Sequence, residues 1–191
     1  TAKMLIVAAW EDLGGKRSRL DFEKESQKLY IKDTYIDKIN NSEIKEHLRE
    51  NKENFFYRSK SDVHCRIDKK PVLAVECKAY TENAMLKRIL VDFTLMKEIK
   101  RWSNIDCYLL QLESQLGGDY SEIKDDSKTI GSPSTRTLLS YFDIDLNIIT
   151  LLKQDRKVDR PIHKPEFFKS LDRINVISAI KTFQKSLKEY I

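Results

Sequence analysis

Two carboxylates and a lysine stand out by their type and spacing. Asp62 is followed, after residues 63–75, by the run Glu76-Cys77-Lys78. Side chains alternate between the two faces of a strand, so Glu76 and Lys78 share one face and Cys77 points to the other. Carboxylate oxygens are preferred ligands of Mg²⁺, and an amine beside them can orient or deprotonate water. The set predicts metal-assisted hydrolysis of a phosphodiester bond.

The segments around these residues predict that they meet at one edge of a sheet. Residues 63–67 and 72–77 are two apolar, strand-like runs. The intervening Asp68-Lys-Lys-Pro71 suits a hairpin turn. In such a hairpin, the residue that precedes the first strand lies beside the far end of the second. Asp62 is therefore expected next to Glu76 and Lys78.

The rest of the chain predicts an α/β fold. Apolar spacing, turn residues and caps predict, in chain order, helices over 2–13 and about 21–39, a short amphipathic turn over 42–48, strands over 55–57, 63–67 and 72–77, a helix over 81–102, strands over 107–112 and 146–152, and a helix over 173–190. The helix over 81–102 is expected to cross over and to place the strand over 107–112 parallel to a neighbour. Residues 117–136 are rich in turn formers and predict a surface excursion.

Length and composition set the outer limits. The 191 residues, 40% hydrophobic and 34% charged, predict a single domain over 1–191, with a core over about 20–113 and a C-terminal extension over about 114–191. The longest apolar run, Met4–Trp10, is too short to cross a membrane. Three scattered cysteines make no disulfide framework, so a reduced, cytoplasmic setting is expected. The net charge of +5 permits an anionic partner without identifying it.

Asp62 with Glu76-Cys77-Lys78, set in a succession of helix, three strands, helix and strand, resembles the PD-(D/E)xK nuclease superfamily, and especially type II restriction endonucleases. The resemblance implies a restriction-endonuclease-like core, with a central mixed sheet flanked by helices. It also implies a Mg²⁺-dependent endonuclease that cuts double-stranded DNA and leaves 5′-phosphate ends. Asp62, Glu76 and the main chain of Cys77 would then ligate the metal, and Lys78 would assist the attacking water. A homodimer is expected, because a duplex has two strands to cut.

Further residues have a candidate role at the site, each with an alternative. Many members of the superfamily place a Glu from the first helix near the metal, and Glu25 is the expected counterpart. A solvent-facing Glu in that helix fits as well, and Glu23 lies on another face. The basic residues Lys16, Arg17 and Lys87 flank the motif and are predicted to contact DNA phosphates, or else to form a solvated surface.

Other reactive residue types have simpler interpretations. Cys65, Cys77 and Cys107 are expected to be buried small hydrophobes, because no CxxC or HxxxH pair supports a zinc site. His64 shares a strand face with Asp62, and a solvent-facing position is favoured over a phosphate contact. Two other functions stay open: a junction-resolving or repair nuclease of the same superfamily, and a non-catalytic DNA-binding subunit with this fold.

Overall fold

The chain is built on a five-stranded mixed sheet. A computed structural model describes residues 1–23, 26–114, 133–152, 159–160, 162 and 164–191. The strand order is β1-β4-β5-β6-β7. The strands are β1 (Leu20–Glu23), β4 (Val63–Ile67), β5 (Lys70–Thr81), β6 (Asp106–Ser114) and β7 (Leu146–Thr150). The first three pair antiparallel, whereas β5, β6 and β7 are parallel. The predicted α/β class, with a mixed sheet flanked by helices, is confirmed.

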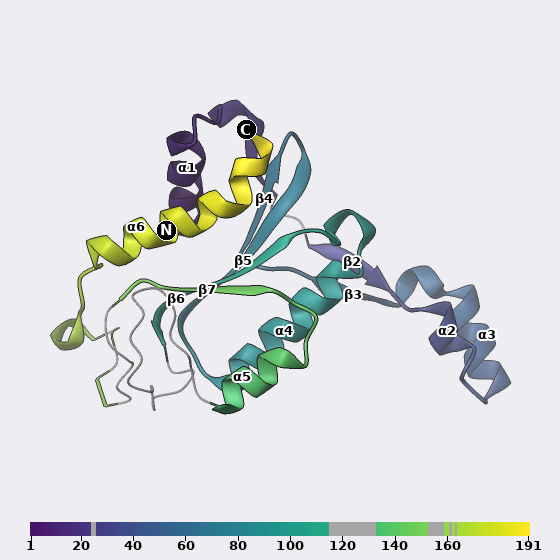
Figure 1. The fold of residues 1–191 in the computed structure, drawn as a ribbon. Coiled ribbons are helices and arrows are strands. Elements are labelled where there is room, and N and C mark those ends of the chain that lie inside the picture. Colours follow the sequence, from purple (N-terminus) through teal and green to yellow (C-terminus); the bar gives the residue numbers. More distant parts are fainter. Residues whose placement is uncertain (24–25, 115–132, 153–158, 161, 163) are drawn as a thin grey trace.

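Helices cover both faces of this sheet (Figure 1). On one face α1 (Ala2–Asp12) packs against α6 (Arg173–Leu187) and the sheet, around the buried Trp10 and Phe183. On the other face lie α4 (Asn83–Lys97) and α5 (Pro133–Ser140), with a buried stripe along α4 that includes Leu90 and Phe93. Alternation along each strand supplies apolar side chains to both layers. The two cores fix the sheet on which the candidate site lies.

The hairpin that carries the motif is the best-predicted part of the fold. Strand β4 has the predicted bounds, and β5 is longer than predicted at both ends. The turn between them holds Asp68 and Lys69 at φ values of 49° and 66°. A left-handed conformation at two successive residues matches the twist of a two-residue hairpin. The register pairs Val63 with Val75.

The helix predicted over 21–39 is wrong. This stretch contains β1, then β2 (Gln27–Tyr30), then the short α2 (Asp33–Ile36). Leu20 and Phe22 pack inward on either side of Asp21, which is the alternation of a strand that pairs with β4. The helix that precedes the three antiparallel strands is instead α1.

A small second sheet leads away from the core. Strand β2 pairs with β3 (Phe56–Ser59), and α2 and α3 (Ser42–Glu50) lie beyond it, to the right in Figure 1. Helix α3 begins after Asn41, whose side chain accepts a hydrogen bond from the Ile44 amide at 3.0 Å. This cap explains why the helix begins there.

Elsewhere the boundaries differ in detail. The helix predicted over 81–102 ends at Lys97 and is followed by a 3₁₀ turn, Lys100–Trp102. The surface excursion predicted over 117–136 ends in a helix instead, because residues 133–136 belong to α5. Its earlier residues, 117–132, lie outside the described residues. Further 3₁₀ turns occur at Arg17–Arg19, Lys52–Asn54, Pro165–Phe167 and Lys188–Tyr190. Among the described segments, no helix has the length and apolarity to cross a membrane.

Candidate active site

The β4–β5 hairpin brings Asp62 beside Glu76. One residue beyond the Val63–Val75 pair, Asp62 stands opposite Glu76 on the antiparallel partner strand. The main-chain N–H of Cys77 donates to Asp62 Oδ2 at 2.7 Å. This bond fixes the Asp62 carboxylate beside β5 and leaves its other oxygen for a ligand. The meeting of the two carboxylates, expected from the hairpin pattern, is observed.

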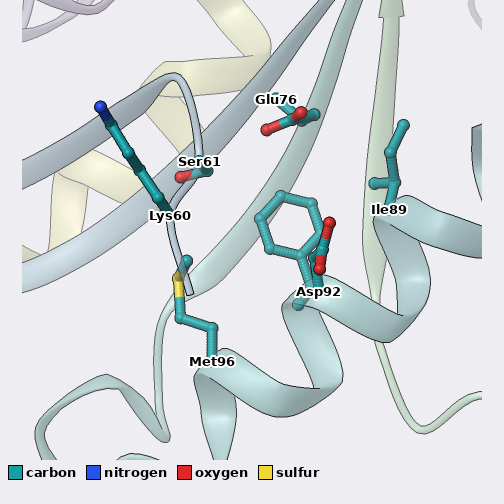
Figure 2. A pocket seen from close by; sticks show the side chains of 7 residues that line it. Lys60, Ser61, Glu76, Ile89, Asp92 and Met96 are labelled. Atoms are coloured by element: carbon teal, nitrogen blue, oxygen red, sulfur yellow. The ribbon is translucent and has the colours of Figure 1, made fainter. Parts of the chain in front are cut away.

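Glu76 and Lys78 face the same side of β5 and form an ion pair. Lys78 Nζ lies 2.6 Å from Glu76 Oε1, and their side chains are 31% and 20% exposed. Glu76 lines a small pocket together with Ser61, from the loop before β4, and with side chains of α4 that include Asp92 and Phe93 (Figure 2). The pair is therefore only partly open to water, on the α4 side of the sheet.

Burial dominates the electrostatics of this pair. Loss of water around Glu76 raises the pKa of its carboxyl group, and the neighbouring Asp62 carboxylate raises it further. Hydrogen bonds from Lys78 and from the Asp62 main chain act in the opposite direction without cancelling the rise. A cation placed between Asp62 and Glu76 would relieve both the burial and the repulsion.

The donors available at this edge suit a hard cation. Asp62 and Glu76 supply carboxylate oxygens, and the Cys77 carbonyl lies on the main chain between Glu76 and Lys78. Among the described residues, no cluster of three or more His, Cys, Asp or Glu side chains could hold a metal. Two carboxylates and a carbonyl suit Mg²⁺, which keeps several of its waters and binds few protein groups.

The surroundings of Cys77 do not favour a role as nucleophile. Burial, Asp62 and Glu76 together raise the pKa of its thiol to about 11, so the thiolate is scarce at neutral pH. Cys65 and Cys107 are fully buried, and all three cysteines are free thiols. Their interpretation as small hydrophobes is confirmed for Cys65 and Cys107, and the half-buried Cys77 packs against the same core as Cys65.

The prediction that His64 faces solvent is wrong. His64 is 1% exposed, and its ring lies 4.6 Å from the Trp102 ring. Its Nε2 accepts a hydrogen bond from the Ser61 main-chain N–H at 3.0 Å. Strand parity placed His64 on the correct face, but the 3₁₀ turn after α4 covers that face with Trp102. His64 thus supports the loop that presents Asp62.

The predicted phosphate-binding residues are not brought together with the motif. Lys16 and Arg17 are exposed on the loop before β1, and Arg17 Nη1 donates to Leu20 O at 2.7 Å. Leu20 pairs with Ile67, at the turn end of the hairpin and away from Asp62. Lys87 is exposed on α4, the helix that follows β5.

Glu25 lies outside the described residues, and the side chain of its neighbour Glu23 is likewise not described. Two side chains near the motif were missed by sequence reasoning. Gln111 lies beside Lys78 on β6, and Asp92 accepts a hydrogen bond from Tyr57 at 2.9 Å. The available signal for Gln111 was that it interrupts the otherwise apolar run over 107–112 in β6.

The mixed sheet, with Asp62 just before β4 and Glu76-Cys77-Lys78 within the neighbouring β5, has the arrangement that the resemblance to the PD-(D/E)xK nucleases implies. The chain is 48% identical over 187 residues to the type II restriction enzyme DdeI of Desulfomicrobium norvegicum, a match that covers 97% of this chain and 76% of that enzyme. The chain therefore belongs to the type II restriction enzymes, which are site-specific deoxyribonucleases.

Two other comparisons add little to this assignment. A solved structure of the native BbvCI A2B2 tetramer at low resolution matches with a TM-score of 0.39 and 12% identity, over 91% of this chain and 60% of that one. No protein-family model matches the chain.

Proposed function

We propose that the chain is a Mg²⁺-dependent endonuclease that hydrolyses phosphodiester bonds of double-stranded DNA and leaves 5′-phosphate ends. The observation that carries the proposal is the meeting of Asp62, Glu76 and Lys78 on the β4–β5 hairpin, in the middle of the sheet, with Asp62 held by the Cys77 amide. Hard oxygen donors and a neighbouring amine are the groups that this hydrolysis requires.

Each group has a distinct task. Asp62, Glu76 and the Cys77 carbonyl would hold the ion, which when bound supplies positive charge against the phosphate and acidifies water. The Lys78 amine would orient the attacking water and stabilise the charge that develops on the phosphate oxygens. The Cys77 N–H keeps Asp62 in position. The α4 side chains around Glu76 limit the access of bulk water.

We further propose that the enzyme acts as a homodimer. The described residues of one chain contain one Asp62–Glu76–Lys78 set, whereas a duplex has two scissile strands. Among the proposed phosphate contacts, Lys87 is closest to the motif along the sequence, and it lies on the helix that follows β5. The turn end of the hairpin carries Lys16 and Arg17 nearby, so these two residues would contact DNA phosphates away from the cleaved bond.

Digestion of unmethylated plasmid and phage DNA tests the proposal. With Mg²⁺ the protein should produce discrete fragments, and with EDTA it should produce none. DNA ligase should join the fragments. Phosphatase treatment before ligation removes 5′-phosphates and should prevent this joining. The matched control is Asp68→Ala, at the other end of the same hairpin, which should cut like the parent, whereas Asp62→Ala should not cut.

Two results would overturn the proposal. Intact DNA after incubation of the folded protein with Mg²⁺, together with metal-independent DNA binding, would indicate a non-catalytic module. Preferential cutting of four-way junctions over linear duplexes would indicate a junction-resolving enzyme.

Sedimentation velocity with a two-site duplex and Ca²⁺ measures the oligomeric state, and a persistent monomer would exclude the dimer.

A further inference from the structure

We propose that Gln111 is a positioning residue for Lys78, which it holds through its side-chain oxygen once Glu76 binds a metal ion. The inference deepens the proposed function and rests on it. It concerns a side chain on the neighbouring strand β6, and it follows from register, burial and hydrogen bonding.

The register places Gln111 beside Lys78 on the same face of the sheet. Strands β5 and β6 are parallel, and Lys78 pairs with Gln111. Adjacent strands lie about 5 Å apart, so side chains from paired positions are neighbours. On β6, Leu109 precedes Gln111 by two residues and packs in the α4 core. Gln111 therefore projects to the side of the sheet that carries the Glu76–Lys78 pair.

The Gln111 side chain is buried, and one of its two polar atoms has no hydrogen-bond partner among the described residues. The residue is 1% exposed, and its Nε2 donates to Thr150 Oγ1 on β7 at 3.0 Å. Within the described part of the chain, its Oε1 has no hydrogen-bond partner. Because the two amide atoms lie on opposite sides of Cδ, an Nε2 directed to β7 turns Oε1 away from that strand. A buried acceptor without a donor is unfavourable, so this oxygen needs an explanation.

Lys78 is the donor that would need this acceptor. In the structure its ammonium is paired with Glu76 Oε1. A cation on the same carboxylate would neutralise its charge and repel the ammonium, so the ion pair would weaken when the metal binds. The nearest acidic side chain further along the same face of β6, Glu113, is already paired with Lys169 and is 1% exposed. Gln111 thus offers a neutral oxygen in the position next to Lys78. A neutral acceptor fixes the amine without adding negative charge where a phosphate must enter.

Binding of Ca²⁺, measured by calorimetry without DNA, tests the inference through a double-mutant cycle. Gln111→Met preserves length and removes the acceptor. We expect it to weaken Ca²⁺ affinity by about tenfold, the value of one hydrogen bond to a charged group. In a Lys78→Met background the same substitution should have little effect, because the donor is absent.

Cleavage provides the second measurement. Gln111→Met should lower the single-turnover cleavage rate while the Kd for DNA stays at the parental value. Thr150→Val removes the hydrogen-bond partner of Gln111 Nε2 and leaves Gln111 Oε1 in place. It should lower the cleavage rate by less than Gln111→Met does, and it replaces that variant if Gln111→Met does not fold. Failure of the parent to cut DNA would reject the proposed function. The double-mutant cycle measured by Ca²⁺ affinity would still test the coupling between Gln111 and Lys78. Parental Ca²⁺ affinity in Gln111→Met, or an equal loss in the Lys78→Met background, would reject the role of Gln111.

Discussion

The two ends of the β4–β5 hairpin carry the same kinds of residues in different surroundings. At the turn end, Arg19 pairs with Asp68 at 2.8 Å, and Arg66 pairs with Asp21. At the other end, Lys78 pairs with Glu76 beside Asp62. Both ends thus combine carboxylates with basic side chains, but the carboxylates of the turn end are more than half exposed, whereas Glu76 is 20% exposed.

The difference in exposure reverses the direction of the pKa shifts. A hydrogen bond from Arg19 lowers the pKa of Asp68, and one from Arg66 lowers that of Asp21. Burial raises the pKa of Glu76 in spite of its bond to Lys78. The pairs of the turn end are satisfied in water, where such pairs contribute little to stability. At the site end, the partly buried Glu76 carboxylate is less well stabilised as an anion, and the proposed metal ion would stabilise it. The two ends therefore differ in how much they would gain from a bound cation.

The largest expected effect is the loss of cleavage when Glu76, a proposed metal ligand at the site end, is removed. Glu76→Ala should slow DNA cleavage by about 10³-fold or more, since a removed group that stabilises transition-state charge costs roughly 10²–10³ and the ion would be weakened as well. The measurement is single-turnover cleavage of a labelled duplex with Mg²⁺. Asp68→Ala is the control, and a similar loss in both variants would remove the distinction between the two ends.

The next effect concerns the amine. Lys78→Met should reduce the cleavage rate by about 10²–10⁴-fold, the range for a residue that handles protons in the reaction. Ca²⁺ affinity should not fall, because the lysine competes with the metal for Glu76. Weaker Ca²⁺ binding in Lys78→Met would show that the ion pair supports the metal ligands rather than the water.

A smaller effect should follow from a change near the turn end. A Cβ on Gly15 would lie 2.1 Å from Trp10 Cε2, and the Trp10 indole donates to Lys16 O at 2.9 Å. Gly15→Ala should therefore destabilise the fold by about 1–3 kcal/mol through overpacking. Urea unfolding measures the loss, and the Ca²⁺ affinity of the folded variant should match the parent. A selective loss of Ca²⁺ binding would couple the two ends.

The smallest effect is a difference in pH dependence. Because the pKa of Glu76 is raised on folding, its contribution to the stability of the metal-free protein is lost as pH rises through that value. The lowered pKa of Asp68 acts in the opposite sense, with stability lost as pH falls through it. Thermal unfolding in EDTA across acid pH should show the first component disappear in Glu76→Gln and the second in Asp68→Asn. The same sign for both would contradict the assigned causes.

The sequence was most informative where local and long-range signals agree. Two apolar runs joined by Asp68-Lys-Lys-Pro71 allow one hairpin register that buries both strands, and this register places Asp62 beside Glu76. Helix α4 and the parallel strand β6 followed from a long apolar stripe and the crossover rule.

Sequence reasoning failed where burial depends on distant segments. A spacing of seven residues, which fits a helix, separates Phe22, Leu29 and Ile36. Phe22 nevertheless belongs to strand β1, because this segment pairs with β4 and packs Phe22 against the core. The burial of His64 depends on Trp102, and the environment of Gln111 depends on Thr150 of β7. Such contacts are decided by packing between segments far apart in the chain, so spacing alone could not indicate them.

The most direct test of the account is a structure of the protein with duplex DNA and Ca²⁺. We predict one ion bound by both Asp62 and Glu76, with oxygen distances of about 2.3–2.6 Å, and a phosphate of the DNA on the same ion. Lys78 should then have left Glu76. An ion that does not touch both carboxylates, or DNA bound away from this edge, would contradict the assignment of the site.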